Sequence, residues 1–360
     1  MSKLSEIESL ISIRIMQEDA EAIYSLLKTE RDSIFSMEVI PYYVLFVHSC
    51  QEYMGENFLP ESMERDFKDI RNHIKVYAER FTKSQRRVLS VDDIQNEDFK
   101  EQLRFDFLKT MNIHLNLGSY WTDTGYIIGN TQQLADFLSV SSIFDPALKE
   151  KNYQMGYQIG SFVASIREGL SDSLDHLIIE RNKNSVKINY YCDINTNSKN
   201  KLFSQSIPKE LNLFFLHLLC NMNFVKHILH PLFVDGNIWS FRIEYIVSYY
   251  TLRALERFKN YCENNYFYES VDIKGIVNIL ACGETVFQTK LRNCMMHYNL
   301  KNAGVITIGN IDKPFYGIIE NCFKGMSYQD YIVSLHNLSD MIIEYLENRF
   351  DFSNVQLEKL

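Results

Sequence analysis

Arg292 and His297 lie in the segment LRNCMMHYNL, with four residues between them. An imidazole has an unperturbed pKa of about 6.5, so it can accept and return a proton at neutral pH. A guanidinium stays charged and can donate two parallel hydrogen bonds to phosphate oxygens. These residue types therefore suit proton transfer next to a phosphate group, provided that the fold brings both side chains to one place.

The pattern of the surrounding residues predicts a helix over 272–297, with Arg292 in the middle of its polar face. At about 100° per residue, His297 lies about 140° around a regular helix from Arg292. We therefore expect either that the helix ends or distorts near 293–296, or that residues of two protomers form the site. Asn293 and His297 are four apart and share a face, so Asn293 could hydrogen-bond the imidazole and fix its tautomer.

The segment LRNCMMHYNL resembles the R-x4-6-H signature of the HEPN superfamily, in which a polar residue often follows the arginine. The likeness covers this motif and the helical context of residues 208–349. It implies a small α bundle whose late helix ends in the motif, and commonly a dimer with two motifs facing one cleft. Many family members are metal-independent endoribonucleases in toxin–antitoxin, abortive-infection and CRISPR-linked defence. Others are inactive and act as binding or scaffold modules.

The resemblance implies a role for each motif residue. His297 would be the general base or acid at the RNA 2′-hydroxyl or leaving oxygen, Arg292 would hold the scissile phosphate, and Asn293 would orient His297. Cleavage through the 2′-hydroxyl would need no metal and would leave a 2′,3′-cyclic phosphate. Gln288 and Tyr298 are the expected substrate-binding neighbours. A family variant that is inactivated by nucleotidyl transfer carries a tyrosine two residues after the histidine. This chain has Asn299 there, so that regulation is not carried over.

The fold class predicted from periodicity is mainly α, with a small β-hairpin over 176–193. Residues 206–350 are expected to form a HEPN-like four-helix bundle, and 351–360 a C-terminal tail. Residues 1–200 are expected to form a separate helical domain of unknown role, followed by a linker at 195–201. The expected helices of the bundle are 208–230, 238–264, 272–297 and 328–349, with Ser327 as a cap; those of the N-terminal domain are 3–30, 36–58, 62–82, 98–115, 118–141 and 147–172, with a loop at 84–98.

The composition is that of a globular protein, with 46% hydrophobic and 23% charged residues among 360. A net charge of −9 argues against a broad platform for duplex DNA, although it leaves room for a local RNA site. The cysteines are odd in number and lack C-x-x-C spacing, which indicates reduced thiols and a cytoplasmic location. The sequence shows neither a signal-peptide pattern nor an apolar run of about 18 residues. We therefore expect no membrane association.

Other polar residues were weighed as sites. His227 and His230 could bind a metal, but their spacing suggests no further ligands, so no metal or other cofactor is predicted. Glu244 and Glu256 could face the Arg292 cleft or could simply be solvated. The basic cluster 83–87 could contact RNA or could be a solvated loop. The expected partners are RNA, a second copy of the chain and an antitoxin or defence protein. Two alternatives remain: a silent HEPN-like module that binds RNA, a nucleotide or a protein, and a helical interaction protein in which the motif is accidental.

Overall fold

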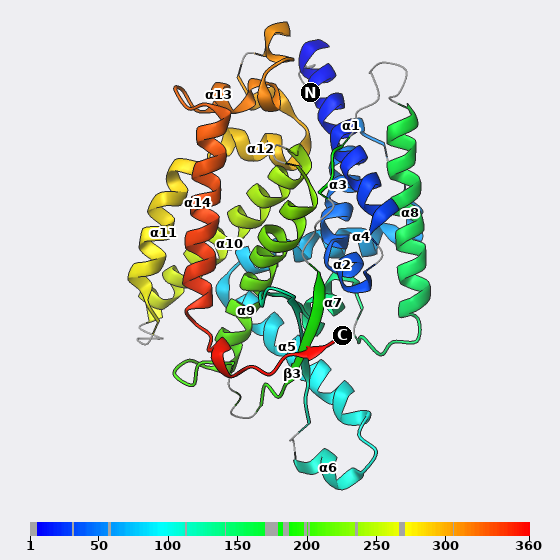
Figure 1. The fold of residues 1–360 in the computed structure, drawn as a ribbon, viewed down its shortest axis with the longest axis vertical. Helices are drawn as coiled ribbons and strands as arrows, with labels where there is room; N and C mark the ends of the chain where they lie inside the picture. Colours follow the sequence, from blue (N-terminus) through cyan, green and yellow to red (C-terminus); the bar gives the residue numbers. More distant parts are fainter. Residues whose placement is uncertain are drawn as a thin grey trace.

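The protein is mainly helical, with a small four-stranded antiparallel sheet at one end (Figure 1). This confirms the predicted fold class. The description rests on a computed structural model. It covers residues 6–30, 32–56, 59–111, 114–140, 142–169, 179–182, 187–197, 200, 202–234, 237–265, 271–304 and 306–360.

Three of the four helices that were expected in the C-terminal half are present, and the helices of this half pack against one another (Figure 1). Nearly every residue of α9 is buried, so this helix lies at the centre of the packing. Ser327 caps the last helix by accepting a hydrogen bond from the backbone N–H of Asp330, as the sequence predicted. The helices are α9 (Lys209–Asn223), which continues through a π-helical segment Phe224–Leu229 (η3), α10 (Ile238–Asn265), α11 (Ile273–Val286) and α14 (Tyr328–Glu347), and the short α13 (Ile318–Cys322) precedes α14.

The N-terminal helices pack along one side of this bundle (Figure 1). The loop predicted at 84–98 was wrong, because these residues belong to the long helix α5. The buried face of α5 includes Ser84, Asp92 and Gln95, and these polar residues conceal the helical period of its apolar ones. The N-terminal helices are α1 (Glu6–Thr29), α2 (Ser33–Glu38), α3 (Ile40–Met54), α4 (Glu61–His73), the 3-10 turn η1 (Val76–Ala78), α5 (Phe81–Glu101), α6 (Asp106–Met111), α7 (Thr131–Phe137) and α8 (Leu148–Gly169).

The sheet has the strand order β2-β1-β3-β4 and replaces part of a predicted helix. β1 (Leu117–Thr122) and β2 (Ile127–Asn130) form a hairpin where a helix over 118–141 was expected, and only α7 in that range is helical. Gly125, with φ of 89°, makes the turn between the two strands. Turn residues followed by the β-branched pair Ile127 and Ile128 were the signal for a hairpin here.

β3 (Ile188–Ile194) overlaps the second half of the predicted hairpin, but it does not pair with the segment that directly precedes it in the sequence. β3 pairs with β1 and with β4 (Glu358–Lys359), so the predicted C-terminal tail adds a strand to the sheet. Residues 183 and 184, which with Asn182 form the expected centre of that hairpin, lie outside the described residues. Of the predicted linker, Thr196 is anchored to Asn116 by a hydrogen bond from its backbone N–H to the side-chain oxygen, at 2.8 Å.

One hydrophobic cluster contains residues from both predicted domains, so the boundary near residue 200 has no counterpart in the core. Aromatic contacts illustrate this continuity, since Phe35 of α2 packs against Phe224 of η3. Ser33–Met54, which spans α2 and α3, is long and apolar enough to cross a membrane by length and composition. Its most apolar window is 67% buried inside the fold, which is also the pattern of a core helix.

Candidate functional site

The predicted helix over 272–297 is broken into two. α11 ends at Val286, the backbone of Phe287 and Gln288 is extended, and α12 (Thr289–His297) begins afresh. α12 in turn ends at His297, because Tyr298 adopts a left-handed conformation with φ of 50°. Such a conformation is strained for a residue with a Cβ and must be held by its surroundings. The break that was expected near 293–296 is therefore absent, since α12 runs unbroken through these residues and ends only after His297.

Arg292 and His297 line one pocket of about 210 Å³ within a single chain. Arg292 and Met296 are four residues apart and share the face of α12 toward the pocket, while His297 reaches it as the final helical residue. The Ser49 hydroxyl of α3 donates a hydrogen bond to the Met296 carbonyl oxygen at 2.7 Å, which ties this helix end to α3. The other lining residues are Leu45, His48, Arg71, Ile74, Lys75, Ala78, Glu79 and Tyr250.

A polar chain of side chains links His297 to the N-terminal helices. The Nδ1 atom of His297 lies 2.7 Å from the Oε2 atom of Glu52, and His48 Nδ1 lies 3.5 Å from the same oxygen. The Nη1 atom of Arg71 contacts His48 Nε2 at 2.8 Å. Burial, and next the charge of Arg71, lower the pKa of His48 to about 4, so His48 is neutral at neutral pH. Because the Arg71 guanidinium can only donate, His48 accepts through Nε2.

The pocket also gathers cations that lack internal counterions. Within the described ranges, no carboxylate oxygen lies within 4.0 Å of the charged nitrogens of Arg71, Lys75 or Arg292. Burial, followed by the charge of Arg71, lowers the pKa of Lys75. The one acidic lining residue, Glu79, is ion-paired with Lys83. The pocket is therefore locally positive in a protein whose net charge is negative, and an anion could neutralise it.

Arg292 is held by aromatic rings rather than by acids. Its guanidinium carbon lies 5.5 Å from the centroid of the Tyr249 ring, within the range of a cation–π contact. Its Nε atom is buried and has no hydrogen-bond partner in the part of the chain that the structure describes. A buried guanidinium N–H without an acceptor is costly unless a ligand completes it.

Three of the sequence-predicted residues are placed differently from expectation. Tyr298 is 1% exposed and its hydroxyl donates to Asp19 Oδ2 at 2.6 Å, so it supports the helix end and does not contact substrate from this position. Asn293 is partly buried, and the carboxylate of Glu52 occupies the imidazole contact that was assigned to it. Gln288 is exposed at the start of α12 and lies outside the pocket lining.

Sequence reasoning missed the contribution of the first helices. His48 and Glu52 are one turn apart on α3, an otherwise apolar helix, and this polar pair was the available signal. Arg71 and Lys75 are likewise four residues apart, at the end of α4 and just beyond it. Nothing in the chain order indicates that these two pairs meet α12, because packing alone joins segments more than 200 residues apart.

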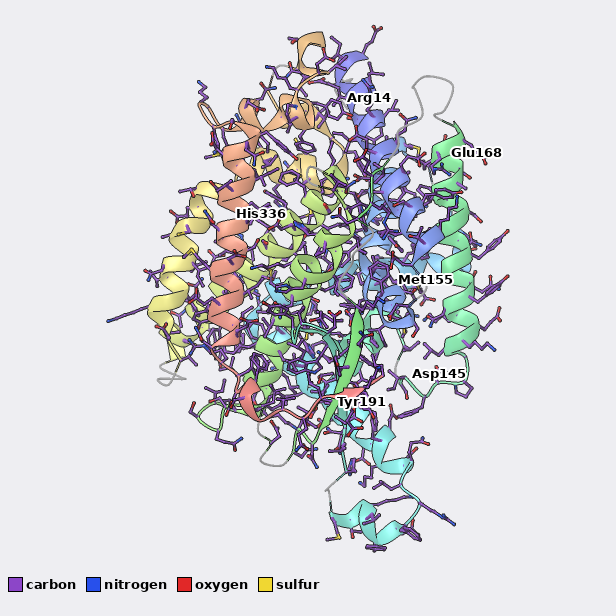
Figure 2. The ribbon with its side chains drawn as sticks, viewed as in Figure 1. Arg14, Asp145, Met155, Glu168, Tyr191 and His336 are labelled. Atoms are coloured by element: carbon purple, nitrogen blue, oxygen red, sulfur yellow. The ribbon has the colours of Figure 1, made fainter. Side chains whose placement is uncertain are left out.

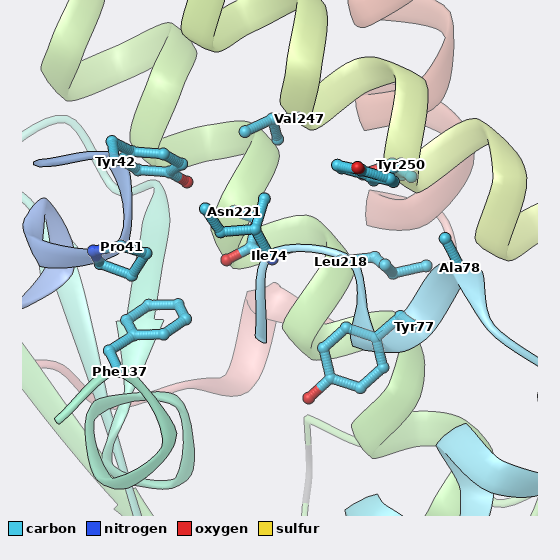
Figure 3. Close-up of a pocket in the computed structure, with 11 residues that line it drawn as sticks. Pro41, Tyr42, Ile74, Tyr77, Ala78, Phe137, Leu218, Asn221, Val247 and Tyr250 are labelled. Carbon is cyan, nitrogen blue, oxygen red and sulfur yellow. The ribbon is translucent and has the colours of Figure 1, made fainter. Parts of the chain in front are cut away.

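A smaller cavity, lined mainly by apolar and aromatic side chains, lies next to this pocket (Figure 3). It has a volume of about 20 Å³, room for a single water molecule, and shares Ile74, Ala78 and Tyr250 with the pocket. Figure 3 shows Tyr77 and Tyr250 approaching it from η1 and α10.

The remaining candidates have internal partners. Lys83 and Arg87 of the basic cluster pair with Glu79 and Asp136, and the cluster is helical. The His227 ring stacks on Tyr126 with ring centroids 3.5 Å apart. Glu256 pairs with Arg253 at 2.6 Å and does not line the pocket.

No family model, curated protein or solved structure matches this chain.

Proposed function

We propose that the pocket is the active site of a metal-independent, HEPN-type endoribonuclease. The observation that carries the proposal is the meeting of Arg292 and His297 with the unpaired cations Arg71 and Lys75 in one pocket. The pocket combines a group that can move a proton with groups that can hold a phosphodiester. Nothing else in the described residues brings these two abilities together next to the motif.

His297 would act as the general base on the ribose 2′-hydroxyl. With Nδ1–H donated to the Glu52 carboxylate, the imidazole carries its lone pair on Nε2, which would take the 2′-hydroxyl proton. The carboxylate fixes the tautomer and stabilises the imidazolium that forms, a relationship found in many catalytic histidines. Glu52 thus takes the orienting role that the resemblance assigned to Asn293.

Arg292, Arg71 and Lys75 would bind the non-bridging phosphate oxygens and stabilise the negative charge that develops on them. The oxygen of the 2′-hydroxyl would bond to phosphorus while the bond from phosphorus to the 5′-oxygen breaks. The products would be a 2′,3′-cyclic phosphate and a free 5′-hydroxyl, whose oxygen takes a proton from water while the His297 imidazolium returns its proton to solvent.

A second copy of the chain is not needed to bring the two motif residues together, because both line a pocket of one chain. A homodimer, an antitoxin or defence partner, and a cytoplasmic location remain predictions. Light scattering of the purified protein tests the dimer, and co-purification with the product of a neighbouring gene tests the partner.

Incubation of the purified protein with single-stranded RNA in EDTA tests the activity. We expect cleavage products with 2′,3′-cyclic phosphate ends. His297→Ala should reduce the rate by about 100- to 10,000-fold, the usual contribution of a general acid or base. Arg292→Ala should also reduce it strongly. A substrate with 2′-deoxyribose throughout should not be cut.

Arg253→Ala is the matched control, since Arg253 also lies against the Tyr249 ring but is paired with Glu256. It should cleave at the wild-type rate. Cleavage that persists in both His297→Ala and Arg292→Ala would refute the site. RNA binding without cleavage, weakened by Arg292→Ala, would instead support a silent RNA-binding module.

A further inference from the structure

A second polar cluster lies in the C-terminal bundle, away from the cationic pocket. It consists of Glu244 on α10, His336 on α14 and His230, which opens the 3-10 turn η4 (His230–Leu232) after η3. Figure 2 shows His336 partway along α14. One ligand atom from each residue lies within 4.8 Å of the others. Three segments that are separate in sequence therefore converge on one point.

Glu244 is the buried member of this cluster. Only 6% of its side chain is exposed, and its Oε1 atom accepts a hydrogen bond from the Ser339 hydroxyl at 2.8 Å. The carboxylate is oriented by Ser339, and its Oε2 atom faces the two imidazoles.

Two of the three separations between ligand atoms match those around a small divalent ion. Oε2 of Glu244 lies 3.1 Å from His336 Nε2 and 3.4 Å from His230 Nε2. Bonds of about 2.0–2.2 Å at a tetrahedral zinc ion place neighbouring ligand atoms about 3.4 Å apart. The two rings lie 5.6 Å apart between centroids and are inclined by 62°, so they do not stack. A small movement of the two imidazoles toward each other would bring all three ligand atoms to bonding distance of one ion.

The cluster also has an open side. His230 and His336 line a pocket of about 420 Å³, together with Asn237, Ser240, Tyr328 and Gln329 among others. His336 is 47% exposed, which leaves an entry path to the cluster. Three protein ligands with an open fourth position are the arrangement of reactive zinc sites, whereas structural sites are usually closed by four ligands.

We propose that Glu244, His230 and His336 bind one divalent transition-metal ion, Zn²⁺ foremost, with its free coordination position facing this pocket. The site departs from the sequence prediction of no metal, because the ligands lie on three different segments. It is independent of the proposed ribonuclease, which needs no metal and uses another pocket.

Elemental analysis tests the proposal on protein that is expressed with added zinc and then freed of loose metal by gel filtration. We expect about one zinc per chain in the wild type. His336→Ala and Glu244→Gln should lower the zinc content at least about tenfold, since each removes a ligand. Substitution with Co²⁺ should give the visible absorption of a four-coordinate site in the wild type and not in His336→Ala.

His227→Gln is the matched control, because His227 lies one turn before His230 but outside the cluster. It should retain zinc. Added Zn²⁺ should also raise the thermal unfolding temperature of the wild type. It should not raise that of the His336→Ala variant, which lacks one ligand. Wild-type protein with no zinc and no thermal shift would overturn the proposal, as would equal zinc in wild type and His336→Ala. The rate of RNA cleavage in EDTA should be the same whether or not the protein binds zinc.

Discussion

Two clusters of charge join α12 to the N-terminal helices, and they differ in whether their charges are balanced. In one, Arg242 of α10 pairs with Asp19 of α1, donates to the Met295 carbonyl oxygen at 2.6 Å and lies over the Tyr298 ring. All of these side chains are buried. We call this the closed cluster. In the other, Arg71, Lys75 and Arg292 surround a pocket without carboxylate partners within the described residues. We call this the open cluster.

Paired and unpaired charges have different effects on the stability of the fold. A buried charge that contacts a counterion holds segments in place, and breaking the pair is costly. Unpaired cations around a pocket add nothing to folding by ion pairing, since they repel one another. A ligand of opposite charge would neutralise them. The closed cluster fixes Tyr298 and hence the end of α12, and this helix end presents His297 to the open cluster.

The largest effect is expected from breaking the closed cluster. Arg242→Ala leaves Asp19 buried without its counterion, which should lower the free energy of unfolding by about 3–5 kcal/mol in denaturant titrations. Arg292→Ala should change it by less than about 1 kcal/mol, because no ion pair is lost. Equal losses in the two variants would remove the distinction between the clusters. A double variant with Asp19→Ala should recover part of the loss, since no charge is then stranded.

Acid sensitivity provides the next comparison, between a histidine in the core and one in the open cluster. His217 is buried with Tyr77 and Gln132 as partners, and burial lowers its pKa to about 3. In the unfolded chain the His217 imidazole therefore takes up a proton near pH 6.5. In the folded protein it stays neutral until the pH is near 3. Stability should fall as the pH drops from about 6.5 toward 3, by up to about 1.4 kcal/mol per pH unit from this residue.

His217→Gln should remove that share of the slope in urea titrations at pH 7, 6 and 5. His48→Gln should flatten the slope less, since His48 is partly exposed. Burial raises the pKa of Glu38, which works in the opposite direction, but this contribution is the same in all three proteins and cancels in the difference. Identical slopes in wild type and His217→Gln would contradict the assignment.

A smaller effect is expected from Glu52→Gln in the open cluster. The amide keeps the shape of the side chain but cannot stabilise an imidazolium at His297. We expect RNA cleavage to slow by about tenfold or more, with little change in RNA affinity, because the loss falls on proton transfer. Asp69→Asn, a neutralised acid on α4 outside the pocket lining, is the control. An unchanged cleavage rate in Glu52→Gln would remove Glu52 from the mechanism.

The smallest effect concerns salt. Each phosphate contact by a cation steepens the fall of RNA affinity with salt by about 0.7 in a double-logarithmic plot. Arg71→Ala and Lys75→Ala should each reduce the slope by about that amount, as measured by fluorescence anisotropy. Arg242→Ala, if folded, should leave it unchanged. A wild-type slope in both pocket variants would mean that RNA does not reach these cations.

Much of the fold could be predicted because strong periodicity survives packing. Three of the four helices expected in the C-terminal half, and the cap at Ser327, follow directly from apolar spacing and breakers. α5 could not be predicted in this way, because its buried face is partly polar and is satisfied by partners such as Gln132, whose amide donates to Asp92 at 2.8 Å. The strands β1 and β2 were missed because a short apolar run fits either a helix or a strand.

The sequence by itself determined the residue types at the motif and their separation of about 140° around a regular helix. It did not determine the site, because Arg292 and His297 lie on one unbroken helix and still line the same pocket. Tertiary structure decided how the helix ends, because the left-handed Tyr298 is held by Asp19 from α1. It also decided which groups complete the pocket, since His48, Glu52, Arg71 and Lys75 reach α12 only through packing of distant segments. The sequence gives the charge of each side chain. Which charges are neutralised depends on the distances between the charged atoms, and only the folded structure sets these distances.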